Sequence, residues 1–80
     1  MTMEKAVQKH ILDLCRKRKL TVNGLANLCS VTQSTIDSIV SGKTRTTTIS
    51  TLQKICDGLG ITILDFFNDP LFENLEPEVK

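Results

Sequence analysis

The chain has 80 residues, of which 40% are hydrophobic, and its formal net charge is +1. A chain of this length buries one modest core, which leaves little room for an active-site cleft or a second ligand-binding domain. With three Phe and no Trp or Tyr, aliphatic side chains must fill most of that core, and this favours helices over a β-sandwich. The composition therefore indicates one small all-α domain that is not an enzyme.

Membrane, export and metal-binding signals are absent from the sequence. No stretch approaches the roughly 18 consecutive apolar residues that span a bilayer, and the N-terminus lacks the apolar segment of a signal peptide. Cys15, Cys29 and Cys56 form no CxxC pair, and His10 has no partner at zinc-ligand spacing. We therefore expect a cytoplasmic protein without metal or cofactor, whose cysteines are buried as small hydrophobic residues.

The charges are unevenly distributed along the chain. Residues 1–46 hold eight Lys or Arg and three Asp or Glu, a balance of +5, whereas residues 47–80 hold two and six, a balance of −4. DNA binding requires a basic face and not a basic protein, so the first part can supply such a face. Charge alone does not separate this interpretation from an ordinary solvated surface.

Apolar residues at helical spacing predict five short helices. A threonine precedes each of the last four helices, where its hydroxyl can cap the free N–H groups of the first turn. The predicted helices span residues 4–18, 22–29, 33–41, 49–59 and 63–67. The capping threonines are Thr21, Thr32, Thr48 and Thr62, and Gly42 and Gly60 follow the third and fourth helices. Thr62 with Asp65 also fits a capping box.

The chain divides into a folded part, residues 1–68, and an acidic C-terminal tail, residues 69–80. The sequence Asn68-Asp69-Pro70 ends the fifth helix, and two prolines with several acidic residues follow. We interpret the tail either as a dimer contact or as a partly disordered segment.

The second and third predicted helices are joined by a tight turn at Ser30 and Val31. Apolar residues of both helices can point into one core, and the small Ala26 allows the two backbones to cross closely. This leaves a polar outer face on the third helix. Its residues are Gln33, Ser34, Asp37, Ser38 and Ser41.

This pattern resembles the Cro/repressor-type (XRE-like) helix-turn-helix family of phage and bacterial regulators. The resemblance rests on Leu25-Ala26, on Val31-Thr-Gln-Ser-Thr-Ile36, on Ile39 and on Gly42-Lys43, with the run from Ile49 to Phe67 matching the family's fourth and fifth helices. It implies a five-helix, lambda-repressor-like DNA-binding domain with the helix-turn-helix at helices 2 and 3. The function it implies is that of a sequence-specific transcriptional regulator, a repressor, that inserts the third helix into the major groove of double-stranded DNA.

The resemblance also assigns residues to the DNA. Base contacts are expected from Gln33, Ser34, Asp37 and Ser38, because a Gln amide can pair with adenine and a Ser hydroxyl can donate or accept. Asp37 can accept from cytosine, or its carboxylate can simply weaken binding to wrong sites. Phosphate contacts are expected from Thr21, Thr32, Lys43, Thr44 and Arg45.

Several positions depart from the family pattern, among them Val22, Ser30 and Lys19. Val22 replaces a Gln that reaches a phosphate, and Ser30 and Lys19 replace frequent glycines, so Ser30 is expected in a left-handed conformation at a cost of about 1–2 kcal/mol. Val22 and the nearly neutral net charge keep a second function open, a protein-interaction module or antitoxin-like partner-binding protein on the same scaffold.

One helix-turn-helix unit reads too few base pairs to select a site, so the resemblance implies a homodimer. Leu71, Phe72 and Leu75 of the tail are candidates for the dimer contact, and the alternative is that the tail folds back on its own domain. No small-molecule effector is evident from the sequence.

Overall fold

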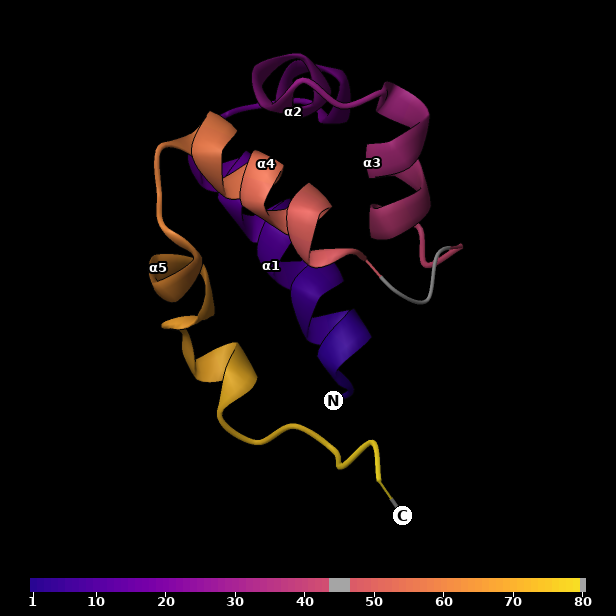
Figure 1. The fold of residues 1–80 in the computed structure, drawn as a ribbon, viewed down its shortest axis with the longest axis vertical. Coiled ribbons are helices and arrows are strands. Elements are labelled where there is room, and N and C mark those ends of the chain that lie inside the picture. Colours follow the sequence, from indigo (N-terminus) through magenta and orange to yellow (C-terminus); the bar gives the residue numbers. More distant parts are fainter. Residues whose placement is uncertain (44–46, 80) are drawn as a thin grey trace.

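The computed structural model describes residues 1–43 and 47–79, and all regular structure in these residues is helical. The elements are α1 (Met3–Lys17), α2 (Val22–Cys29), α3 (Gln33–Val40), α4 (Ile49–Leu59), α5 (Ile63–Phe67) and a short 3-10 helix, η1 (Pro70–Phe72). The five predicted helices are thereby confirmed. In Figure 1, α3 and α5 lie on opposite sides of the molecule, with α1 and α4 between them.

A threonine caps the start of every α-helix. In each case the side-chain oxygen accepts a hydrogen bond of 3.0–3.3 Å from the backbone N–H three residues later. The capping residues are Thr2, Thr21, Thr32, Thr48 and Thr62. Asp65 completes the predicted capping box by accepting from the Thr62 N–H at 3.4 Å. Each cap is worth about 1 kcal/mol, which explains why the helices start where they do.

Four helices are followed by a residue with left-handed backbone: Lys19 (φ 55°) after α1, Ser30 (φ 56°) after α2, Gly42 (φ 83°) after α3 and Gly60 (φ 72°) after α4. After α1, α2 and α4 the next N–H turns back to a carbonyl of the last helical turn, as in the bond of 2.8 Å from Leu20 to Cys15. The predicted left-handed Ser30 is therefore confirmed, as are the glycines predicted after the third and fourth helices. Only the two glycines adopt this conformation without steric strain.

One hydrophobic core joins the α-helices. Its largest fully buried side chains are Phe66, Ile11, Leu25, Ile36 and Ile55. The three cysteines belong to the same core and are free thiols, as predicted. Burial raises the pKa of all three thiols, so they remain protonated and unreactive.

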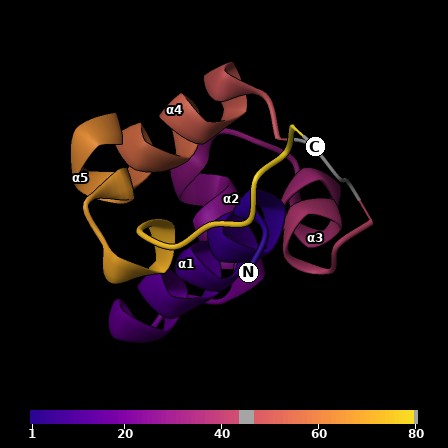
Figure 2. The same cartoon turned by 90° about the horizontal axis from the view of Figure 1, so that it is seen from below.

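The C-terminal segment folds back along α1. The side chain of Phe72 packs against the core, and Leu71 and Leu75 are half-buried. Further along, the Glu76 N–H donates to the Met1 carbonyl at 3.0 Å, and the Glu76 carboxylate lies 3.7 Å from the Met1 amine. Figure 2 shows this segment in yellow, crossing the N-terminal end of α1.

His10 of α1 holds the beginning of this segment in place. Its ring is buried and meets Phe66 edge-on, at 4.6 Å between ring centroids, and Phe72 likewise at 5.6 Å. Its Nδ1 atom lies 3.8 Å from a carboxylate oxygen of Asp69, and the other Asp69 oxygen accepts from the Leu71 N–H at 3.0 Å. Sequence analysis found no role for His10, because its partners are distant along the chain.

Candidate nucleic-acid interface

The unit formed by α2 and α3 has the buried side predicted from the sequence. Leu25 and Ala26 of α2, and Ile36 and Ile39 of α3, are buried in the common core. The chain reverses between the helices through the left-handed Ser30, and Thr32 caps α3 at once. Such a short connection fixes α3 relative to α2, so the outer face of α3 is held rigidly.

The outer face of α3 is polar and open to solvent. Gln33, Ser34 and Asp37 are exposed, and Ser38 is half-buried. Gln33 and Asp37 are four residues apart, as are Ser34 and Ser38, so these side chains lie on one side of the helix. The structure thus brings together the four residues expected to contact bases, at the margin of the molecule away from α5 (Figure 1).

Two of the three threonines expected to contact phosphates, Thr21 and Thr32, are already used as helix caps. The Thr21 hydroxyl oxygen accepts from the Gly24 N–H at 3.0 Å. The Thr32 hydroxyl accepts from the Thr35 N–H at 3.2 Å and shares a second hydrogen bond of 2.8 Å with the Thr35 hydroxyl. Because the bond to Gly24 uses only a lone pair of the Thr21 oxygen, the hydroxyl proton remains available to an anion.

Basic side chains flank this unit but do not lie on it. Neither α2 nor α3 contains Lys or Arg. Lys43 is exposed just beyond α3, and residues 16–19 are an exposed basic run at the end of α1. Thr44 and Arg45, two of the expected phosphate contacts, lie outside the described residues. Positive charge is therefore found before and after the unit of α2 and α3 along the chain, and not on the two helices themselves.

Val22 begins α2 and is half-buried against the core. Its side chain has no polar atom to offer a phosphate, so an anion at this helix end would depend on backbone N–H groups and on Thr21.

The fold agrees with comparisons to known proteins. The description of a Cro/C1-type helix-turn-helix DNA-binding domain matches residues 10–70, most of the chain. The chain belongs to this family. Its five-helix, repressor-type fold and its helix-turn-helix at α2 and α3 are those of DNA-binding regulators.

Two crystal structures are similar to this member of the Cro/C1-type family. The prophage Lp1 protein 11 has a TM-score of 0.79 and 33% sequence identity, covering 94% of this chain and 99% of that chain. An HTH_3 family transcriptional regulator from Vibrio cholerae has a TM-score of 0.76 and 26% identity, covering 85% of this chain and 38% of that chain. No curated protein matches.

Within residues 1–43 and 47–79, no three His, Cys, Asp or Glu side chains come together in a way that could hold a metal ion. In that part of the chain, no helix combines the length and the apolar character needed to cross a membrane.

Proposed function

We propose that this Cro/C1-type protein is a transcriptional repressor that binds a specific DNA site by placing α3 in the major groove. The supporting observation is the exposed polar face of α3 on a helix whose other side is locked into the core. Gln33 and Ser34 stand at the start of the helix, the end that enters the groove in this type of docking.

The proposed contacts divide into two kinds. Gln33, Ser34, Asp37 and Ser38 read base edges, and a Gln amide in particular suits adenine. Thr21, Thr32 and Lys43 hold phosphates, together with Thr44 and Arg45 of the following segment. Phosphate contacts set the position of the protein on the duplex and supply the part of the affinity that depends on salt.

Alanine substitutions distinguish the two kinds of contact once a site has been selected from random DNA. We expect Lys43→Ala to weaken binding to all sequences alike and to lower the slope of log affinity against log salt by about one unit. Gln33→Ala should instead change preference at one base position, by about 1–3 kcal/mol. Fluorescence anisotropy at several salt concentrations measures both effects.

Lys54→Ala and Gln53→Ala are the matched controls, because both residues are exposed on α4. Neither control should change affinity or site preference. Equal effects of Gln33→Ala on every sequence would remove Gln33 from base recognition, and a salt slope unchanged by Lys43→Ala would remove Lys43 from the phosphate contacts.

We also propose that the protein binds DNA as a homodimer. Leu64 of α5 is 82% exposed, and the half-buried Leu71 and Leu75 belong to the segment that follows α5. Exposed apolar side chains of this kind favour a self-complementary contact. Phe72 is a weaker candidate, because its ring is engaged with His10 and Phe66.

Sedimentation at micromolar concentration tests the dimer. We expect the unaltered protein to dimerise, alone or on a palindromic site, and Leu64→Asp and Leu71→Asp to prevent it. Leu28→Asp is the control, since Leu28 is an exposed leucine of α2. A wild-type protein that stays monomeric both free and on DNA would refute the dimer.

The alternative function, a protein-interaction module or antitoxin-like protein, is supported by the absence of Lys and Arg from α2 and α3 and by Val22. Random duplex DNA separates the two functions. A repressor of this type should bind it measurably at low salt and lose affinity steeply as salt rises, whereas a protein-binding module should not.

A further inference from the structure

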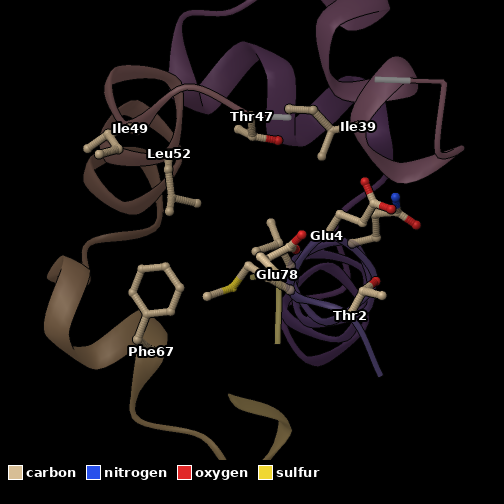
Figure 3. Close-up of a pocket in the computed structure, with 11 residues that line it drawn as sticks. Thr2, Glu4, Ile39, Thr47, Ile49, Leu52, Phe67 and Glu78 are labelled. Carbon is tan, nitrogen blue, oxygen red and sulfur yellow. The ribbon is translucent and has the colours of Figure 1, made fainter. Parts of the chain in front are cut away.

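A cavity of about 530 Å³ lies on the side of the fold where α1, α3, α4, α5 and the C-terminal segment meet. Its wall contains Val7, Ile39, Leu52 and Phe67. In Figure 3, Ile49, Leu52 and Phe67 lie on one side of the cavity, and Thr2, Glu4 and Glu78 lie on the other. The volume falls within the range of small-molecule sites in proteins.

Six of the eleven residues that line the cavity are apolar, and one of them is a highly exposed isoleucine. Val7 and Leu52 are 8% and 7% exposed, so these core residues still reach the surface of the molecule. Ile49, which also lines the cavity, is 81% exposed at the start of α4. An apolar group bound in the cavity would therefore cover apolar protein surface that is otherwise in contact with water.

The charge at the edge of the cavity is negative. Among the described residues that line it, the charged ones are Glu4 and Glu78, both carboxylates. The N-terminal ends of α1 and α4 border the cavity, and each contributes about half a positive charge, while the last turn of α3 contributes about half a negative one. The total charge at the edge is negative, because the two carboxylates outweigh the contributions of the helix ends. The Met1 amine does not alter this balance, since it is paired with Glu76.

We propose that this cavity binds a small amphipathic amine, with its apolar body against Leu52 and Phe67 and its ammonium group at the carboxylates of Glu4 and Glu78. Ile39 connects the cavity to α3, since it lines the wall and lies on the helix that carries Gln33 and Ser38. Occupation of the cavity then alters DNA affinity, and this regulatory part rests on the proposed function.

Sequence analysis found no effector site because the cavity has no local signature. Its apolar residues read as ordinary core positions of separate helices, and Glu78 belongs to a segment whose course along α1 depends on distant contacts.

Three probes of equal apolar body and different charge test the site: phenylbutylamine, phenylbutanol and phenylbutanoate. The full chain, isotope-labelled, is titrated with each while backbone amide resonances are followed. The amine should bind saturably, shift the amides of Val7, Ile39, Ile49 and Leu52, and bind about tenfold more tightly than the alcohol. The carboxylate should bind most weakly. Equal affinities for all three probes, or no saturable binding, would overturn the proposal.

Substitutions locate the site without disturbing the core. Glu4→Gln combined with Glu78→Gln should reduce amine affinity to that of the alcohol, whereas Glu73→Gln, an exposed carboxylate outside the cavity, should not. Ile49→Ser should weaken amine and alcohol alike, and Leu28→Ser is its control, because Leu28 is also an exposed apolar residue and does not line the cavity. Equal effects of Ile49→Ser and Leu28→Ser would place the amine elsewhere.

The regulatory part is tested on the selected DNA site. Amine affinity should differ between free and DNA-bound protein, and the amine should change DNA affinity by the same factor, as linkage requires. Ile49→Ser should abolish both changes. If the amine does not change DNA affinity, regulation is refuted and the binding of the amine still stands. If the protein binds no DNA at all, the proposed function is refuted, and the titrations alone decide whether the cavity binds the amine.

Discussion

Gly58 determines how closely two helices of this small core can pack. A β-carbon at this position would lie 2.7 Å from the Cys29 sulfur and 2.8 Å from the Leu28 carbonyl oxygen. The second atom is backbone, so α2 itself would have to move. Gly58 therefore allows α4 to pass directly against α2. From the sequence, the small Ala26 was expected to allow two helices to cross closely. Gly58 is a second residue with this role.

Replacing Gly58 with alanine should destabilise the protein. Alanine improves helix propensity by about 1 kcal/mol, but forcing an extra methyl group into a packed core typically costs about 1–3 kcal/mol, and backbone movement adds to that. We expect a net loss of about 1–2 kcal/mol in the free energy of unfolding, measured in urea.

Gly24→Ala is the comparison for this experiment. A β-carbon at Gly24 would meet its nearest atom, the exposed Thr21 hydroxyl, at 3.3 Å, and the other atom within 4 Å is a side-chain carbon of Leu20. Alanine improves helix propensity at this position as well, so we expect between no change and a gain of about 1 kcal/mol. A Gly58→Ala protein as stable as Gly24→Ala would show that α2 and α4 can separate without loss.

At the scale of the helices, the residues at the helix starts suit their positions better than the residues at the helix ends do. Every α-helix starts at a threonine cap. Two of the four left-handed positions that follow a helix are occupied by Lys19 and Ser30, residues for which this conformation is strained. The turn between α2 and α3 therefore contains a local strain that the packing of Val31 and Ile36 must offset.

Ser30→Gly should relieve that strain. Glycine adopts the left-handed conformation freely but loses more backbone freedom on folding, so we expect a net gain of about 0.5–1 kcal/mol in stability. Ser41→Gly, at an exposed residue with right-handed backbone after α3, should instead be neutral or destabilising. Thermal or urea unfolding of both variants measures the difference. A gain of the same size at both positions would mean that the φ of Ser30 is not the cause.

The helices were predictable because their signals are local. Caps, breaks and apolar spacing lie within a few residues of each boundary, as Thr62 and Asp65 illustrate. The outer face of α3 was predictable for the same reason, since the buried Ile36 and Ile39 determine which side is left. The path of the tail was not predictable, because the contact between Phe72 and His10 joins residues that are far apart in the sequence.

At the scale of the whole molecule, aromatic rings attach the C-terminal segment. Phe66, Phe67 and Phe72 lie within 4.9–5.9 Å of one another between ring centroids, with His10 against two of them. Edge-to-face pairs of this kind add about 0.5–1.5 kcal/mol beyond their burial. Residues from both ends of the chain thus belong to a single packed unit.

Phe72→Ala should loosen this attachment. Because Phe72 is half-buried, we expect a loss of about 1–3 kcal/mol, below that of a fully buried phenylalanine. Amide hydrogen exchange should speed up in residues 71–76, including the Glu76 N–H that bonds to Met1. Glu73→Ala, exposed beside it, should leave both quantities unchanged. Protection of the Glu76 amide that survives Phe72→Ala would show that the segment is held without the ring.

The hydrogen bond between the Glu76 N–H and the Met1 carbonyl holds the C-terminal segment beside the first residue. A few glycine and serine residues, running from the positions after Glu76 back to Met1, would join them into a covalent ring with every helix in place. That ring can be cut again at an exposed connection, such as the one between α4 and α5, to give a circularly permuted chain. The order in which the helices emerge during synthesis would then be open to choice, while α3 kept its surroundings.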